Sequence, residues 1–131
     1  MSKITTGLRL AKNAARLSTY PRVTMGAIIM KNSTIIGVGN NLMKTSPKQK
    51  KYNHFRGFEP PHGNTIHAEV SAILNCNTSM VGAEIFVQRI MKNGTTGISK
   101  PCIACHNAIK DAGITKVWYH DENGNLLNYK V

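Results

Sequence analysis

The stretches IHAEV (residues 66–70) and KPCIAC (residues 100–105) decide the fold and the chemistry of this chain. They supply one imidazole, His67, and two thiols at Cys-x-x-Cys spacing, Cys102 and Cys105. One nitrogen and two sulfurs form a ligand set that suits Zn²⁺, and three protein ligands leave the fourth position of a tetrahedral ion open. The sequence therefore predicts a catalytic zinc centre.

Both stretches are typical of helix starts. Pro101 favours the first turn of a helix, which places Cys102 and Cys105 one turn apart on the same side. His67 falls at or near a second helix start, and two helix N-termini directed at one point stabilise thiolates. Glu69, two residues after His67, is placed to reach the open metal position without coordinating. That is the position of a proton shuttle beside an activated water.

Two alternatives are open for the cysteines: a redox pair and a structural zinc site. A structural site normally closes with a fourth Cys or His. The third cysteine, Cys76, lies nine residues after His67 on the same expected helix. It is too far along that helix to join the ligands, so we expect it to be a small core residue.

Beyond the ligands, the chain resembles the zinc-dependent cytidine/deoxycytidylate deaminase superfamily. Within it the chain is most similar to small phage or bacterial members of the deoxycytidylate/tRNA-adenosine deaminase branch. The resemblance rests on the pattern H-A-E…P-C-x-x-C and extends over about residues 3–120, in the segments GAIIMKNSTIIGVGNN, HAEVSAI, AEIFVQR and KPCIACHNAIKDAGITKVWY. It implies one deaminase domain over residues 1–131, with a three-layer α/β/α fold around a mixed sheet of about five strands. It also implies that Glu69 moves protons while water adds to C4 of cytosine or C6 of adenine.

Hydrophobic periodicity and turn residues predict alternating helices and strands, which indicates a mixed sheet with helices on its faces. Helices are expected at residues 3–18, 65–77 and about 101–111, and strands at 22–31, 34–40, 83–91, 114–120 and 125–131. Residues 41–65 contain Pro and Gly with little periodicity, and we interpret them as a long functional loop.

The resemblance also implies which residues contact the substrate. An Asn after the second strand hydrogen-bonds the ribose in this branch; Asn41 is the matching position and Asn40 the alternative. Met25 would line the base pocket, and Ala68 would offer its backbone amide to the base. Tyr119 would either stack on a base or belong to the core.

The net charge of +11 is distributed unevenly along the chain. Residues 1–56 contain eleven Lys and Arg and no acid, whereas residues 57–131 contain six of each. This asymmetry favours a phosphate-bearing ligand over a merely solvated basic surface.

Basic and aromatic residues alternate within the expected loop, at Lys44, Lys48, Lys50, Lys51, Tyr52, His54, Phe55, Arg56 and Phe58. The mixture suits a nucleotide or a polynucleotide, and the alternative is a mobile loop whose aromatic side chains pack under the domain. Further basic residues lie near the cysteines in sequence, at Arg89, Lys92 and Lys100. His54 and His62 would form a second metal site with Glu59, but loop histidines are more often exposed, and both stay unassigned.

Composition excludes several classes of protein. With 41% hydrophobic and 18% charged residues the chain is typical of a globular domain rather than a disordered one. No apolar run has the length of a membrane span, and residues 1–17 lack the apolar segment of a secretory signal. Three cysteines do not make a disulfide framework, so we expect a reducing, cytoplasmic compartment.

The first expectation for the substrate is a cytosine mononucleotide, with dCMP converted to dUMP. Deamination of a base within tRNA or single-stranded DNA is the enzymatic alternative, and the high positive charge favours it. A basic nucleic-acid-binding module with structural zinc is the alternative from another class, and it would make Glu69 dispensable. The resemblance further implies a homo-oligomer.

Overall fold

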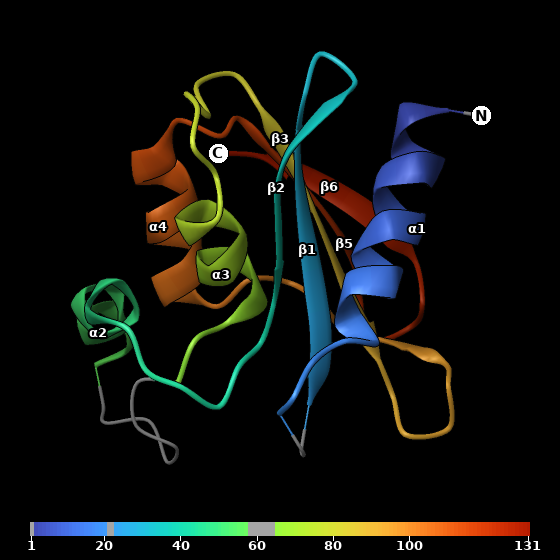
Figure 1. The fold of residues 1–131 in the computed structure, drawn as a ribbon. Helices are drawn as coiled ribbons and strands as arrows, with labels where there is room; N and C mark the ends of the chain where they lie inside the picture. The colour runs from blue at the N-terminus through green and yellow to red at the C-terminus, as the bar shows by residue number, and fades with distance from the viewer. Residues whose placement is uncertain (1, 21–22, 58–64) are drawn as a thin grey trace.

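The computed structural model describes residues 2–20, 23–57 and 65–131. His62, Glu59 and Phe58, which the sequence singled out in the loop, lie outside these ranges. Figure 1 shows the sheet nearly edge-on, with α1 on one side and α2, α3 and α4 on the other. The expected three-layer α/β/α fold is thereby confirmed.

The helices and strands follow one another in the expected order, with three short additions, α2, η1 and β4. The helices are α1 (Lys3–Ala15), α2 (Pro47–Asn53), α3 (Ala68–Leu74) and α4 (Ile103–Ala112), with the 3₁₀ turn η1 (His54–Arg56) after α2. The strands are β1 (Thr24–Lys31), β2 (Thr34–Asn40), β3 (Glu84–Ile90), β4 (Thr96–Gly97), β5 (Lys116–His120) and β6 (Leu126–Lys130).

The sheet is mixed. Its strand order is β2-β1-β3-β5-β6, and the short strand β4 pairs with β3. β3 and β5 are parallel, whereas the other pairs are antiparallel. A parallel pair requires a crossover connection, and α4 provides it. The start of α4 therefore lies near the ends of β3 and β5, where the catalytic residues are expected.

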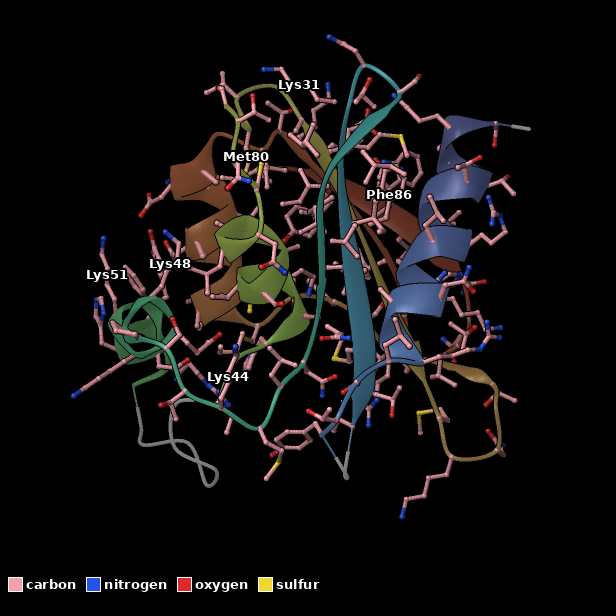
Figure 2. The ribbon with its side chains drawn as sticks, viewed as in Figure 1. Lys31, Lys44, Lys48, Lys51, Met80 and Phe86 are labelled. Carbon is pink, nitrogen blue, oxygen red and sulfur yellow. The ribbon has the colours of Figure 1, made fainter. Side chains whose placement is uncertain are left out.

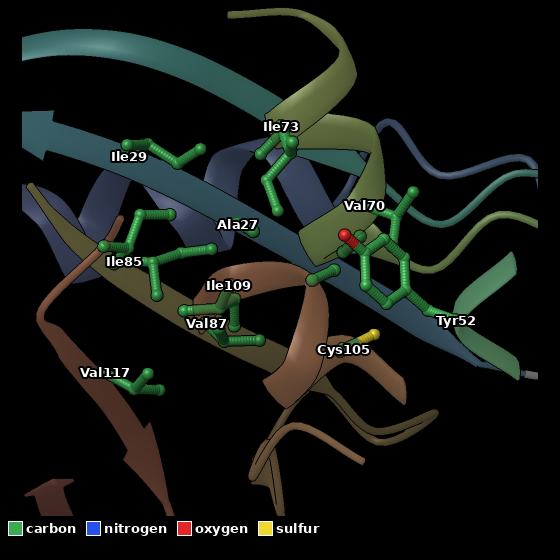
Figure 3. Packing of buried hydrophobic residues seen from close by; sticks show 14 of the residues in the cluster. Ala27, Ile29, Tyr52, Val70, Ile73, Ile85, Val87, Cys105, Ile109 and Val117 are labelled. Atoms are coloured by element: carbon green, nitrogen blue, oxygen red, sulfur yellow. The ribbon is translucent and has the colours of Figure 1, made fainter. Parts of the chain in front are cut away.

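Each face of the sheet has its own hydrophobic cluster. Ile85 and Val87 of β3 face α3 and α4, whereas Phe86 between them packs on the other face with Ala11 of α1, as alternation along a strand requires (Figures 2 and 3). All three strand side chains are fully buried. Burial of each such side chain stabilises the fold by about 1.5–3 kcal/mol, so the packing holds helices firmly on both faces.

Two glycines allow helices to lie directly on strands. A Cβ atom at Gly26 of β1 would clash with the backbone of Ala11 in α1, and one at Gly39 of β2 would clash with the backbone of Ala68 and Ala72 in α3. Only glycine permits so close an approach of two backbones. Gly39 therefore fixes the first turn of α3, which follows His67, against the sheet.

Helix α2 is the main departure from the sequence-based expectation, which read residues 41–65 as loop. Ser46 caps α2 with its side chain, and Pro47 occupies its first turn, both ordinary start signals. The buried residues are Gln49, Tyr52 and Asn53, at the i, i+3, i+4 spacing of one helix face. The sequence reading missed this helix because it has 7 residues and its inward face carries polar atoms.

Other boundaries differ by a few residues. α1 ends at Ala15 because the amides of Leu17 and Ser18 donate to carbonyls three residues back, which tightens the last turn. α3 begins at Ala68 rather than near residue 65, because His67 has an extended backbone with φ −77° and ψ 158°. Within the described ranges, no helix combines the length and the apolar character that crossing a bilayer requires.

Candidate active site

Three side chains from two helix starts converge on one point. His67 is the N-cap residue of α3, Cys102 is the N-cap residue of α4, and Cys105 lies one turn into α4. His67 Nδ1 is 3.3 Å from Cys105 Sγ and 3.7 Å from Cys102 Sγ. Neither N-cap side chain makes a capping hydrogen bond to its helix. Both are therefore free to serve the shared centre, and the structure brings together the three residues that the sequence predicted.

The donor set fits a zinc ion. With Zn–N of about 2.0–2.1 Å and Zn–S of about 2.3 Å at tetrahedral angles, nitrogen and sulfur lie about 3.6 Å apart. The two observed distances, 3.3 Å and 3.7 Å, bracket that value. In the part of the chain that the structure describes, the metal-compatible group consists of His67, Cys102 and Cys105. Three ligands leave one position of a tetrahedral ion for water or substrate, as in catalytic zinc sites.

The pKa values of the three side chains are shifted in different directions, because the side chains hydrogen-bond to one another. The hydrogen bond from the Cys105 thiol does most to lower the pKa of Cys102 to about 3, while burial opposes it and His67 assists. The same hydrogen bond and burial raise the pKa of Cys105 well above its usual value. Burial lowers the pKa of His67, but the hydrogen bond to Cys102 and the charge of Glu69 outweigh it, so the net shift is upward. A divalent cation bound here would displace the shared protons.

Glu69 lies in the first turn of α3 and is 3% exposed. Burial raises the pKa of its carboxyl group, against the opposing charge of His67. A raised pKa makes a carboxylate a better acceptor for a proton that it later releases, which a general acid–base residue requires. Glu69 thus lies beside the ligands, where the sequence placed it, and its role as proton carrier remains a prediction.

Two buried polar residues that the sequence reading missed hold the backbone beside the ligands. Gln49 of α2 accepts a hydrogen bond of 3.0 Å from the backbone N–H of His67. Ser99 Oγ donates to the carbonyl of Val87 in β3 and accepts from the N–H of His120 in β5, both at 2.9 Å. Gln49 lay in the segment taken for a loop, although its spacing with other buried residues could have revealed it. No sequence signal marked Ser99.

Asn41 is 7% exposed, and its side chain braces the start of β1. Its Oδ1 accepts hydrogen bonds from the N–H of Met25 at 3.0 Å and from Ser18 Oγ at 2.5 Å, and its Nδ2 donates to the carbonyl of Val23 at 2.5 Å. The alternative, Asn40, donates to the carbonyl of Ala14. The ribose contact of Asn41 stays a prediction, while its structural role is directly visible.

Met25 and Ala68 lie on the side of the sheet that carries the ligands. Met25 is half-buried against the cluster under α3 and α4, and Ala68 is buried within it. Because Ala68 is the first residue of α3, its backbone N–H has no acceptor inside the helix. The amide is thus available in the way that a contact to the base would require.

Tyr119 lies in a shallow hollow beside the cysteine helix. The hollow has a volume of about 390 Å³ and is lined by Lys100, Pro101, Ile103, His106, Tyr119 and Tyr129. The rings of Tyr119 and Tyr129 meet edge-on with centroids 5.9 Å apart, and His106 Nδ1 lies 3.1 Å from Tyr129 Oη. Burial and the charge of Glu69 raise the pKa of Tyr129 to about 12, so this tyrosine, which the sequence reading passed over, is within electrostatic reach of the site.

The basic residues of the expected loop lie mostly on α2. The side chains of Lys48 and Lys51 lie near that of Tyr52 (Figure 2), with their Nζ atoms 5.9 Å and 5.3 Å from the centroid of its ring. Tyr52 packs inward against α3 and α4 (Figure 3), whereas Phe55 is 43% exposed. Arg89 and Lys92 line a separate hollow of about 630 Å³ between the start of β1 and the segment after β3.

Comparison with known proteins supports the same chemistry. Residues 1–121 match the family model described as the cytidine and deoxycytidylate deaminase zinc-binding region. The ComE operon protein 2 of Bacillus subtilis (strain 168) is 32% identical over 108 residues, which are 80% of this chain and 52% of that protein. The chain thus spans about half the length of this relative.

Two phage proteins are similar over most of their length. The deoxycytidylate deaminase of Mycobacterium phage D29 is 29% identical over 128 residues, covering 88% of this chain and 92% of the phage protein. The crystal structure of dCMP deaminase from the cyanophage S-TIM5 in complex with dCMP and dUMP matches with a TM-score of 0.61 at 27% identity, covering 89% of this chain and 79% of that chain. With the three-ligand geometry and the match over residues 1–121, these similarities show that the chain belongs to the cytidine and deoxycytidylate deaminase family of zinc-dependent hydrolytic deaminases.

Proposed function

We propose that the chain is a zinc-dependent deoxycytidylate deaminase, which converts dCMP and water to dUMP and ammonia. The observation that carries the proposal is the three-ligand cluster with the buried carboxyl group of Glu69 beside it. The substrate follows from the relatives: the protein of phage D29 is named a deoxycytidylate deaminase, and that of cyanophage S-TIM5 was crystallised with dCMP and dUMP.

The ligand residues in this proposal are His67, Cys102 and Cys105, which would hold the ion through Nδ1 and the two sulfurs. Zinc supplies, when bound, a Lewis acid that makes water reactive near neutral pH. Glu69 takes a proton from the attacking water and delivers it to N3 of the cytosine ring. The water oxygen bonds to C4 first. Glu69 then takes the remaining proton from that oxygen and transfers it to the amine, so that C4=O forms, the C4–N bond breaks and ammonia departs.

The raised pKa of Glu69 suits a residue that transfers two protons in one reaction. A carboxylate with an ordinary pKa is a weak base for the proton of water, and burial, which raises the pKa of Glu69, makes it a stronger one. Burial also keeps bulk water from exchanging the proton during the reaction. A single carboxyl group can then serve both transfers, because they occur in sequence.

The residues that recognise the substrate complete the proposal. Asn41 would contact the ribose, Met25 would line the base pocket, the backbone N–H of Ala68 would contact the base, and Tyr119 would stack on it. The positions of Ala68 at a helix start and of Tyr119 in an aromatic hollow support these roles. The basic residues on α2 would attract the 5′-phosphate.

The biological setting in this proposal is a single domain that acts on a free nucleotide in the cytoplasm and assembles as a homo-oligomer. A reducing compartment suits a site that needs its thiols free, and all three cysteines are free. A nucleic-acid substrate is the competing possibility because of the net charge of +11. It predicts binding that weakens steeply with salt, whereas dCMP engages few cations.

The proposal is tested with a deamination panel read by absorbance, using the zinc-loaded protein. The substrates are dCMP, dCTP, deoxycytidine, CMP, an adenosine-bearing tRNA loop and single-stranded DNA. We expect dCMP to react with the highest kcat/KM and deoxycytidine, which lacks the phosphate, to react far more slowly. Turnover of DNA or tRNA in place of dCMP would overturn the choice of substrate while leaving the deaminase chemistry standing.

A further inference from the structure

We propose that Gln49 is a positioning residue for the zinc ligand His67, and that it sets the metal affinity of the site by fixing the backbone from which the imidazole extends. The inference rests on the zinc-dependent function proposed above. It assigns a role in the metal site to α2, a helix that carries none of the three ligand residues.

The backbone of His67 is held on both sides. As the N-cap residue of α3, His67 has an N–H group that lies before the helix and finds no helical acceptor. Gln49 Oε1 accepts this N–H at 3.0 Å, and the His67 carbonyl accepts the N–H of Ser71 at 2.9 Å. With both peptide groups fixed, two side-chain torsions are left to aim Nδ1, which lies 3.3 Å from Cys105 Sγ.

The orientation of the Gln49 amide is itself determined. Gln49 is fully buried, and its Nε2 donates a hydrogen bond of 2.9 Å to Oδ1 of Asn53, one turn later in α2. Because the backbone N–H of His67 can only donate, the end of the amide that faces it is the oxygen, and the nitrogen end faces Asn53. A buried amide whose donor and acceptor both have partners is fixed in place.

Helix α2 is anchored at a second point, away from the metal. Tyr52 is 3% exposed, and its hydroxyl donates to Asp111 Oδ2 of α4 at 2.7 Å. Lys50 and Lys51 of α2 are exposed to solvent. Glutamine is seldom fully buried, and here its side chain joins α2 to the ligand-bearing segment before α3. The anchor at Tyr52 therefore allows the docking of α2 and the positioning of His67 to be tested separately.

The test replaces Gln49 by Met, which has nearly the same volume and accepts no such hydrogen bond. Partners of metal ligands typically change metal affinity by about 10- to 100-fold when they are removed, and we expect a loss of that size for Gln49→Met. Zinc affinity is measured by competition with a chromophoric chelator. The Co²⁺-substituted protein gives a second readout, since its thiolate-to-cobalt absorption reports the ligand geometry without any substrate.

Three further variants isolate the hydrogen bond. Lys50→Met makes a matched change on the exposed side of the same helix and should leave zinc affinity at the wild-type value. Tyr52→Phe weakens the docking of α2 but keeps Gln49. Its zinc affinity should stay within about twofold of the wild-type value, a much smaller change than the one expected for Gln49→Met. Gln49→Glu keeps an acceptor for the N–H of His67 and should bind zinc more tightly than Gln49→Met.

Each outcome decides one question. Folded Gln49→Met that binds zinc as tightly as wild type would overturn the inference, and so would equal losses in Gln49→Glu and Gln49→Met. If Gln49→Met does not fold, the comparison of Gln49→Glu with wild type decides, because a 10-fold or larger loss there, with the acceptor retained, would also overturn it. A wild-type protein that binds no zinc would overturn the proposed function instead.

Discussion

The Nδ1 atom of His67 lies 3.3 Å from the Sγ atom of Cys105, although 38 residues separate the two in sequence. Each residue comes from the first turn or the cap of a helix, and both helices pack on the same face of the sheet. The ligand atoms are therefore carried by helices that are packed against the sheet.

Glu69→Gln tests the proton carrier. The amide cannot take the proton of water, so we expect turnover of dCMP to fall by about 10²- to 10⁴-fold, the usual contribution of a general acid–base group. Zinc content and melting temperature should stay close to wild type, because Glu69 lies outside the ligand group. Turnover is measured as dUMP formed, and metal content by elemental analysis of the same sample. A variant that keeps full activity would remove Glu69 from the mechanism.

Removal of zinc should lower both activity and stability. A metal that binds the folded chain only, at a concentration 1,000 times its Kd, stabilises the fold by about 4 kcal/mol. We expect dialysis against a strong chelator to abolish turnover and to lower the melting temperature, with both recovering when Zn²⁺ is added back. Cys105→Ser serves as the control that should not recover. Undiminished turnover in protein shown to be free of metal would contradict the zinc assignment.

Ser99→Ala tests the brace that holds the segment before the cysteines. Ser99 is 1% exposed and joins the carbonyl of Val87 to the N–H of His120. Its loss leaves buried polar groups unpaired, so we expect the free energy of unfolding to fall by about 1–3 kcal/mol. Urea unfolding measures the change, with the exposed Ser79→Ala as control. A change no larger than that of Ser79→Ala would show that Ser99 is not a brace.

Tyr52→Phe makes a prediction about pH. Burial and the hydrogen bond to Asp111 raise the pKa of Tyr52 from 10.0 to about 12. Because the folded pKa is the higher one, the stabilisation by this hydroxyl is complete below pH 10 and is lost as the pH rises towards 12. The free energy of unfolding of the wild type should exceed that of Tyr52→Phe by about 1 kcal/mol at pH 8. This difference should shrink between pH 10 and 12. A difference that stays constant over that range in urea unfolding would contradict the assignment.

Much of the fold could be predicted because its helices and strands are marked in the sequence by hydrophobic periodicity and by turn residues at their ends. The hairpin of β1 and β2, the strand β3 and the helix after Pro101 all follow from periodicity and turn residues. The ligands His67, Cys102 and Cys105 were recognisable because metal chemistry restricts both residue type and spacing. In the structure their ligand atoms lie within 4.8 Å of one another.

The remainder depends on tertiary contacts that have no local signature. Gln49 and Ser99 have structural roles because of their hydrogen bonds to distant parts of the chain. Gln49 accepts from the N–H of His67, and Ser99 joins strands β3 and β5. Asn41 was predicted as a ribose contact, and the bracing of β1 by its side chain could not be read from the sequence. Cys76, expected in the core, is only partly buried, because α3 ends at Leu74 before reaching it.

The measurement that tests the account most directly is the conversion of dCMP by purified protein with one zinc per chain. The absorbance change is followed together with ammonia release. The account predicts dUMP and ammonia in equal amounts, with no turnover after zinc is removed and little in Glu69→Gln. Stoichiometric zinc with no dUMP formed, under conditions where the protein is folded, would contradict it.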